Sequence, residues 1–220
     1  MLNGPSFIPT KINKAVILCH GYGASGDDLA DLIPNLAPDL PETAFFCPNA
    51  PHLLPFGGYE WFSLNDYQPK EMFNIDYLNR LIARAKPSVS LLTDFCNYIC
   101  KQYNISPSQI VLGGFSQGGL IALQTALTFP ESIAGAIGMS AVPVIFGADF
   151  PQTNITQKPP ILLTHGSTDA VVPPEAFNLN ISQLKSIGII PQTSVSEGLG
   201  HGIDQAALQQ IRSFLIKHLQ

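Results

Sequence analysis

Ser116 lies at the centre of residues 114–118, GFSQG, which have the pattern G-x-S-x-G. The motif directly follows a predicted strand, Ile110–Gly113, and directly precedes a predicted helix, Gln117–Leu127. This order of strand, turn and helix is required of a nucleophile elbow, a sharp turn that exposes a serine hydroxyl at the edge of a sheet. Glycines two residues to either side avoid clashes with a Cβ atom in such a turn. A glycine-rich turn that merely connects strand to helix is the alternative, but the context favours a nucleophile.

Three histidines follow Ser116 and could supply the base that a serine nucleophile needs. Hydrolases with this elbow have the chain order Ser, then Asp or Glu, then His. His218 belongs to a terminal amphipathic helix, where exposure to solvent is the simplest expectation, and His165 closes a predicted strand, where packing is the simplest expectation. His201 lies among three glycines in residues 197–202, EGLGHG, after the last predicted strand. We therefore predict that His201 is the base.

The carboxylate that orients the base must lie between Ser116 and His201, where the candidates are Glu131, Asp149, Asp169, Glu175 and Glu197. Asp169 follows the predicted strand Ile161–Thr164 in a turn and precedes a helix that begins with prolines. This places it at the same sheet edge as Ser116, so we predict that Asp169 orients the base. Asp149 lies in a loop and is the second candidate. An ordinary turn or helix-capping role is the alternative for Asp169.

Acyl transfer also needs donors for the negative charge that develops on the carbonyl oxygen, usually two backbone amides. One is expected from Gln117, the residue after the nucleophile. Residues 20–26, HGYGASG, form a glycine-rich loop after an earlier predicted strand, and Tyr22 N–H is the best match for the second donor. The same loop imitates a dinucleotide-binding fingerprint. However, the acidic residue expected about 20 residues later is missing, because the next strand ends in Cys47-Pro48-Asn49.

Residues 48–70 form a long predicted loop with four prolines and the pair Gly57-Gly58, and it carries Phe56, Tyr59, Trp61 and Phe62. Loops of this length in compact domains are often functional. We predict an apolar wall or lid here, with Trp61 and Phe62 as substrate-binding residues. Hydrophobic anchoring of a long loop is the alternative for each aromatic residue.

The elements that must position these residues follow one pattern, in which short apolar runs alternate with helical stretches. The predicted strands are Ala15–His20, Thr43–Cys47, Ile110–Gly113, Ala134–Met139, Ile161–Thr164 and Thr193–Glu197. The predicted helices are Asp27–Leu36, Asn74–Tyr103 with an interruption at Pro87, Gln117–Leu127, Pro173–Ile187 and Ile203–Leu219. Such alternation predicts an α/β fold with a mostly parallel sheet and helices on both faces. No change in composition divides the chain, so we expect a single domain over residues 1–220.

Composition and charge argue against several classes of protein. The net charge is -5, and the 11 Lys and Arg residues never form a block of three, which disfavours nucleic acid and anionic lipid surfaces as partners. No apolar run reaches the roughly 18 residues of a membrane span, and residues 1–10 lack the features of an export signal. We therefore expect a cytoplasmic protein without integral membrane association. In that setting we expect buried thiols rather than disulfides or a metal site at Cys19, Cys47, Cys96 and Cys100.

Five segments, in order along the chain, resemble the phospholipase/carboxylesterase family, which includes the acyl-protein thioesterases. They are residues 18–23 (LCHGYG), Trp61-Phe62, residues 113–119 (GGFSQGG), His165-Gly166 through Asp169 to Val172-Pro173, and residues 198–201 (GLGH). The resemblance extends over nearly the whole chain. It implies an α/β-hydrolase fold without a large cap domain. It also implies the same catalytic residues, with Ser116 as nucleophile, Asp169 as orienter, His201 as base, and Tyr22 and Gln117 as oxyanion donors.

Two positions depart from the family pattern. The family often has Leu where this chain has Tyr22, and Asp commonly follows Trp-Phe where this chain has Ser63. A backbone donor tolerates the first change, so these differences bear on the preferred acyl length rather than on the chemistry.

Together these features predict a serine carboxylesterase that hydrolyses short-to-medium acyl esters through an acyl-enzyme, with no cofactor or metal. The expected partner is a small acyl ester or a lipid-like substrate, and a monomer and a homodimer are both compatible with the sequence. An acyl-protein thioesterase or a lysophospholipase is the alternative within the same chemistry. A non-catalytic, small-molecule-binding member of the fold is the alternative of another class. The presence of Ser116, Asp169 and His201 together argues against that last alternative.

Overall fold

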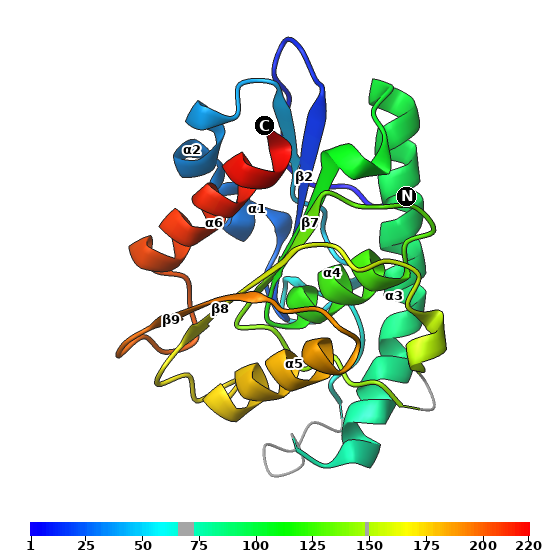
Figure 1. The fold of residues 1–220 in the computed structure, drawn as a ribbon, viewed down its shortest axis with the longest axis vertical. Helices are drawn as coiled ribbons and strands as arrows, with labels where there is room; N and C mark the ends of the chain where they lie inside the picture. Colours follow the sequence, from blue (N-terminus) through cyan, green and yellow to red (C-terminus); the bar gives the residue numbers. More distant parts are fainter. Residues whose placement is uncertain (66–72, 148–149) are drawn as a thin grey trace.

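A seven-stranded sheet forms the centre of the protein, whose computed structural model describes residues 1–65, 73–147 and 150–220. Its strands are β1 (Ser6–Phe7), β2 (Lys14–Cys19), β3 (Thr43–Phe46), β6 (Ile110–Phe115), β7 (Gly135–Met139), β8 (Ile161–Gly166) and β9 (Gln192–Ser196). Their order is β1-β3-β2-β6-β7-β8-β9. All neighbouring pairs are parallel except β1 with β3. This is the mostly parallel sheet that the sequence pattern predicts, and it agrees with the α/β-hydrolase fold that the resemblance implies. No large cap domain covers it in the described part of the chain (Figure 1).

Helices cover both faces of this sheet. They are α1 (Gly26–Ala30), α2 (Ile33–Leu36), α3 (Ile75–Tyr103), α4 (Gln117–Thr128), α5 (Pro174–Ser186) and α6 (Gln205–Leu219), with short 3-10 turns at Ala37–Asp39, Pro107–Gln109 and Gln152–Asn154. Side chains of α3, α4 and α5 share one core cluster with Ala15 and Ile17, and those of α1, α2 and α6 share the other with Val16 and Leu18. Alternate residues of β2 therefore point into opposite cores, which explains why its sequence is apolar without a break.

The predicted helix Asp27–Leu36 is wrong in one respect, because the structure has two short helices there. Ser25 caps α1 with a capping box that includes Asp28. Pro34 has no N–H to continue that helix, and it lies instead in the first turn of α2, where a missing N–H costs nothing.

The predicted interruption at Pro87 is also wrong, since α3 continues through it as one helix of 29 residues. Pro87 lies on the exposed face of α3, so water can bond the carbonyl one turn earlier that loses its helical partner. The buried positions on both sides of Pro87, among them Ala85 and Ser88, keep the packing of the helix against the protein.

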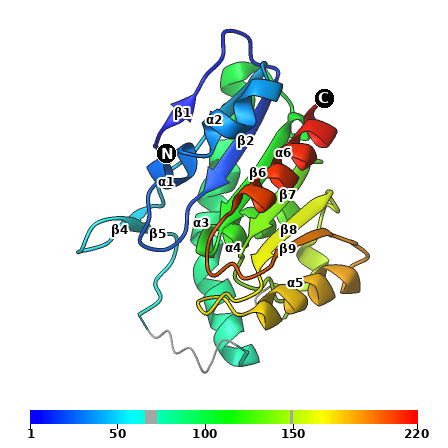
Figure 2. The same cartoon turned by 90° about the vertical axis from the view of Figure 1, so that its left-hand side faces the viewer.

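Three two-residue strands were not predicted, because they are too short to show a period in the sequence. One is β1, which adds an antiparallel edge to the sheet. The other two, β4 (His52–Leu53) and β5 (Tyr59–Glu60), form a small hairpin within the long loop. Figure 2 shows this hairpin extending from the body of the protein on the side of α1. Residues 66–70 of the predicted loop lie outside the described residues.

Two further expectations need correction. Cys19, Cys47 and Cys96 are buried free thiols, but Cys100 is only half-buried. Burial raises the pKa of Cys47 to about 12. His218 is half-buried rather than fully exposed, because its ring packs against Phe214 with centroids 4.4 Å apart.

In the described part of the chain, every helix is too short or too polar to cross a membrane.

Candidate active site

Ser116 occupies the sharp turn between β6 and α4, with φ 54° and ψ -116°. A non-glycine residue in this region costs about 1–3 kcal/mol and persists only where its surroundings hold it. Here the Ser116 N–H donates to Met139 O at 2.9 Å, and the Ser116 carbonyl accepts from Gly119 N at 3.1 Å and Val142 N at 3.2 Å. The neighbouring strand end and the first turn of α4 thus hold the strained residue from both sides.

Close backbone contacts explain the two glycines that flank Ser116. A Cβ atom on Gly114 would lie 2.2 Å from Gly118 O, and one on Gly118 would lie 2.2 Å from Cys19 O and 2.4 Å from His20 O. The start of α4 therefore touches the end of β2 through its backbone. This contact brings the turn at Ser116 next to the loop that begins at His20.

The substitution Gly118→Ala is expected to damage both the fold and the activity. The added Cβ meets backbone atoms that cannot move aside, so we expect a loss of about 1–3 kcal/mol in the free energy of unfolding. The forced shift between α4 and the loop after β2 should lower kcat at least roughly 10-fold. Urea unfolding and steady-state ester kinetics measure the two effects.

Gly200→Ala is the matched control, because a Cβ there has no neighbour within 4 Å. Equal stability and activity of the two variants would contradict the role of the close contact at Gly118.

Asp169 and His201 are hydrogen-bonded to each other. His201 Nδ1 donates to Asp169 Oδ2 at 2.7 Å, and Asp169 Oδ1 accepts from the N–H groups of Val171 and Val172, each at 2.9 Å. Burial alone would raise the pKa of Asp169, but the hydrogen bonds from His201 and from the Val172 and Val171 amides outweigh it and lower the pKa. The carboxylate is therefore ionised at neutral pH and holds His201 with its Nδ1–H toward Asp169.

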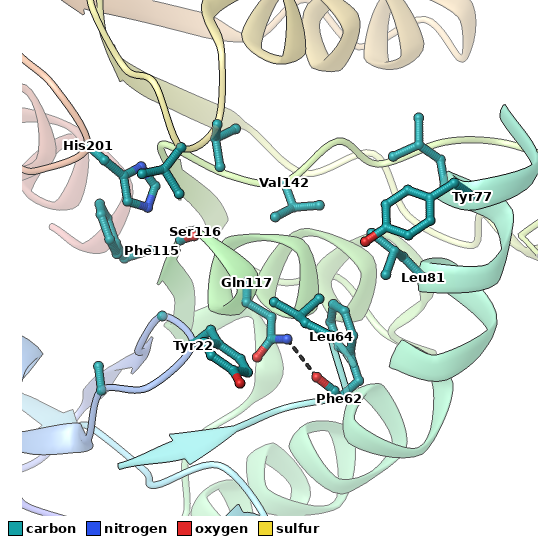
Figure 3. Close-up of a pocket in the computed structure, with 15 residues that line it drawn as sticks. Tyr22, Phe62, Leu64, Tyr77, Leu81, Phe115, Ser116, Gln117, Val142 and His201 are labelled. Atoms are coloured by element: carbon teal, nitrogen blue, oxygen red, sulfur yellow. Dashed lines mark hydrogen bonds between the residues drawn. The ribbon is translucent and has the colours of Figure 1, made fainter. Parts of the chain in front are cut away.

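The other ring nitrogen of His201, Nε2, is left free of Asp169. The ring packs on Phe115, the residue before Ser116, with centroids 4.6 Å apart, and His201 and Ser116 line the same cavity. Figure 3 shows the two side chains next to each other at one end of this cavity. Among the described residues the Ser116 hydroxyl has no hydrogen-bond partner. In unliganded enzymes such bonds are often long and tighten only when substrate binds. The structure thus brings Ser116, His201 and Asp169 to one site.

The two amides expected to bind an oxyanion belong to residues that line the same cavity. Tyr22 and Gln117 both line it, and within the described residues neither N–H has a hydrogen-bond partner. Gln117 is the first residue of α4, where N–H groups have no acceptor inside the helix and carry the positive end of its dipole. An oxyanion bound here would therefore meet unpaired donors.

The cavity has a volume of about 490 Å³, within the range of small-molecule sites. Ser116 and His201 lie at its polar end. Its body is apolar and is lined by Phe62, Leu64, Tyr77, Leu78, Leu81 and Val142. Figure 3 shows Leu64 and Val142 between Ser116 and the α3 residues Tyr77 and Leu81. An acyl chain attached to a carbonyl at Ser116 would thus enter an apolar pocket.

The two aromatic residues expected to bind substrate differ in their surroundings. Phe62 lines the cavity. Trp61 does not line it; it is fully buried, and its indole N–H donates to His20 O at 2.9 Å. The expectation for Trp61 is thus corrected to a role beneath the site. Asp149, the second candidate for the carboxylate, lies outside the described residues.

Two buried histidines close to the site are hydrogen-bonded to the backbone segments that surround it. His20 Nδ1 donates to Gly21 O at 2.7 Å and His20 Nε2 accepts from Ala50 N at 2.9 Å, so both nitrogens of this ring are used. His165 Nε2 donates to Val172 O at 2.8 Å and lies 3.7 Å from Asp169 Oδ2. Sequence reasoning gave His20 no role, although its place directly before the glycine-rich loop was the available signal.

Acid is expected to destabilise the fold through these histidines. Burial lowers the pKa values of His20 and His165 from the ordinary value of 6.5. The unfolded chain therefore binds more protons than the native one just below that pH, so stability rises with pH in this window. The contribution is fully present above about pH 6.5 and is lost as the pH falls toward the lowered native values. Urea midpoints measured between about pH 7.5 and pH 5 test this.

His165→Gln, which cannot titrate there, should flatten part of this slope. A wild-type midpoint that does not change over the same range would contradict the prediction.

The comparisons with known proteins agree with this geometry. The family model described as Phospholipase/Carboxylesterase matches residues 9–219. The chain belongs to the phospholipase/carboxylesterase family. With this membership the protein is a serine hydrolase with an α/β-hydrolase fold.

Similar members of the phospholipase/carboxylesterase family include the acyl-protein thioesterase 1 of Aspergillus fumigatus. It is 31% identical over 234 residues, which cover 97% of this chain and 92% of the relative. The acyl-protein thioesterase 1 of Emericella nidulans is 28% identical, with 98% and 95% of the two chains covered. Among solved structures, esterase PE8 has a TM-score of 0.86 at 32% identity and covers 99% of both chains. Acyl-protein thioesterase 2 of Zea mays, at 21% identity and a TM-score of 0.72, shares the fold.

Proposed function

We propose that the chain is a serine carboxylesterase that uses Ser116 as nucleophile, His201 as general base and Asp169 as the group that orients the base. The observation that carries the proposal is the 2.7 Å hydrogen bond between His201 Nδ1 and Asp169 Oδ2, in a ring that shares a cavity with Ser116. This bond fixes the ring so that Nε2 is the nitrogen available to accept a proton. The proposal is supported by the chain positions of the three residues, which follow β6, β8 and β9, because the carboxyl ends of parallel strands lie at one edge of a sheet.

The proposed reaction begins when Ser116 Oγ attacks the carbonyl carbon of the ester and its proton passes to His201 Nε2. The amides of Tyr22 and Gln117 donate to the oxyanion of the tetrahedral intermediate. His201 returns the proton to the leaving oxygen, the ester bond breaks, and an acyl-enzyme forms on Ser116. Water then attacks this acyl group, again giving a proton to His201. Collapse of the second intermediate returns that proton to Ser116 and releases the acid. Every step uses groups of the protein, the substrate and water.

The shape of the cavity supports short-to-medium acyl esters as substrates. Ser116 and His201 lie at one end of it, and most of the remaining lining is made of aliphatic and aromatic side chains. A volume of about 490 Å³ suits a small ligand or an acyl chain of moderate length.

A thioester is the second candidate substrate, favoured by the relatives named acyl-protein thioesterase 1 that match 97% and 98% of this chain. The same attack applies, with sulfur rather than oxygen as the leaving atom. Lysophospholipids would present an equivalent ester.

We also propose that residues 1–220 act as a single domain, because β1 near one end of the chain and α6 at the other pack into the same sheet structure.

A fluorophosphonate probe tests the nucleophile directly. Ser116 Oγ should attack phosphorus and displace fluoride, and peptide mass mapping should find the adduct on the peptide that contains Ser116. p-Nitrophenyl esters of increasing acyl length, compared with an acyl-CoA and a lysophospholipid, then rank the substrate classes. Stable labelling at another residue, or no labelling of folded protein, would overturn the assignment and favour a non-catalytic, ligand-binding role.

A further inference from the structure

The Tyr59–Phe62 segment is hydrogen-bonded to the loop that carries Tyr22. Gly23 N–H donates to Tyr59 O at 2.9 Å, and Tyr59 N–H donates to Ala24 O at 2.8 Å. These are the residues that directly follow Tyr22. The position of this segment therefore bears on the position of the Tyr22 amide.

The same segment is hydrogen-bonded to the side chain of Gln117. Trp61 N–H donates to Gln117 Oε1 at 2.8 Å. Gln117 Nε2 donates to Phe62 O at 2.8 Å, the bond drawn as a dashed line in Figure 3. Gln117 is buried, so water does not compete for either bond. A carboxamide has one acceptor and one donor group at its end, and both are used here on consecutive residues. A glutamate lacks the donor, and an aliphatic side chain lacks both.

Trp61, in the middle of the Tyr59–Phe62 segment, adds two further hydrogen bonds between this segment and the rest of the protein. Its indole N–H donates to His20 O at 2.9 Å, and its carbonyl accepts from the Ser88 hydroxyl of α3. Trp61 is fully buried, so its bulk is held by packing as well. The segment is thus hydrogen-bonded to His20 directly after β2, to α3 and to α4, and its last residue, Phe62, lines the cavity.

We propose that the Gln117 side-chain amide is a positioning group that couples the acyl-binding wall at Phe62 to the spacing between the Tyr22 and Gln117 backbone amides. The proposal rests on the proposed function, in which those two amides bind the oxyanion. Oxyanion donors act at about 2.7–3.1 Å from the charge, and a misplacement near 1 Å costs on the order of 100-fold in rate. The Gln117 side chain joins the start of α4 to the Tyr59–Phe62 segment, and that segment joins the Tyr22 loop. One residue thereby holds both donors at a fixed separation.

The variant Gln117→Met tests the proposal, because it keeps the backbone N–H and a similar side-chain length but loses both side-chain hydrogen bonds. With p-nitrophenyl acetate, whose acyl group carries only a methyl beyond the carbonyl and so depends least on the acyl-binding wall, we expect kcat to fall about 10- to 100-fold. With p-nitrophenyl hexanoate we expect the same fall in kcat and in addition a rise in KM, because Phe62 loses its anchor. Wild-type and variant enzymes are compared at equal fractions of folded protein.

Gln124→Met is the matched control. Gln124 is buried in the same helix, two turns further on, and its Nε2 has no hydrogen-bond partner within the described residues. Its replacement removes a buried glutamine without touching the Tyr59–Phe62 segment. We expect kcat and KM of this control to stay within about two-fold of wild type on both esters.

The outcomes separate the proposal from simpler roles. A lower melting temperature of Gln117→Met with unchanged kcat on the acetate ester would mean a merely structural role and would overturn the proposal. An effect confined to KM for the hexanoate ester would mean that Gln117 supports only the wall, which would also overturn it. Absence of any ester turnover by wild-type enzyme would instead count against the proposed function itself.

A second variant covers the case in which Gln117→Met does not fold. Trp61→Phe removes the indole bond to His20 O together with part of the buried ring, and it leaves the backbone bonds from Gln117 to Trp61 N and Phe62 O in place. We expect a smaller fall in kcat on the acetate ester, about 3- to 10-fold. An unchanged kcat in this variant would contradict a role of Trp61 in holding the Tyr59–Phe62 segment and, through it, the oxyanion donors.

Discussion

Replacing Ser116 with alanine is expected to lower kcat for ester hydrolysis by about four to six orders of magnitude. The side chain has no structural hydrogen bond within the described residues, and the strained backbone is held by bonds of the main chain to Met139, Gly119 and Val142. The variant should therefore fold like the wild type while losing the atom that attacks the carbonyl. Residual turnover would come from the oxyanion donors and from binding alone. Stopped-time assays at high enzyme concentration, together with a melting curve, measure both quantities.

Ser140 offers a matched control for this experiment. It is buried, it follows the adjacent strand β7, and it also has a positive φ, of 43°. Its hydroxyl has no hydrogen-bond partner in the described part of the chain, so Ser140→Ala should keep nearly full activity. If Ser116→Ala retained more than about a hundredth of the wild-type kcat, the nucleophile would have to be another group.

Asp169→Asn is expected to lower kcat by roughly 10⁴ with little change in the fold. An asparagine can still accept from the amides of Val171 and Val172 through its carbonyl oxygen. Its NH₂ group would then face His201 Nδ1 and would favour the ring tautomer that carries the proton on Nε2. That tautomer cannot accept the proton of Ser116. The loss should appear in kcat for every ester of the series, since the defect concerns proton transfer and not the acyl pocket.

Asp204→Asn is the control carboxylate for this second prediction. Asp204 also sits in a dense set of hydrogen bonds, accepting from Ala207 N and from Ser196 Oγ at 2.8 Å each, but it caps α6. Asparagine is an equally good cap, so both stability and kcat should change little. Were Asp169→Asn to keep a tenth or more of the wild-type kcat, Asp169 would not be the orienting group, and Asp149 would be tested next.

The parts of the fold that were predictable are those that depend on local sequence. Unbroken apolar runs such as residues 15–19 mark strands buried on both faces, and the glycines around Ser116 mark a turn that only small residues permit. The order of elements then requires the carboxyl ends of β6, β8 and β9 to meet at one edge. Because that rule concerns topology, the sequence alone was enough to predict that Ser116, Asp169 and His201 lie at the same edge of the sheet.

The parts that were not predictable depend on contacts between distant segments. Whether Pro87 ends the helix depends on whether it lies on the solvent-exposed face of the helix. The sequence alone does not determine the exposure of a single residue. Trp61 has the character of a substrate-binding aromatic residue, but its indole finds the carbonyl of His20 and lies fully buried. The side-chain bonds of Gln117 to residues 61 and 62 span more than 50 positions of the chain. No periodicity in the sequence reports such a contact.

Pro87 has a consequence for how this cavity could diversify. It divides α3 into a first part, which carries the wall residues Leu78 and Leu81, and a second part, which packs through Leu92, Phe95 and Ile99. A bend introduced at Pro87 would carry Leu78 and Leu81 together and leave the second part in place. The width of the cavity is thus adjustable from Pro87, an exposed position that is not among the residues lining it.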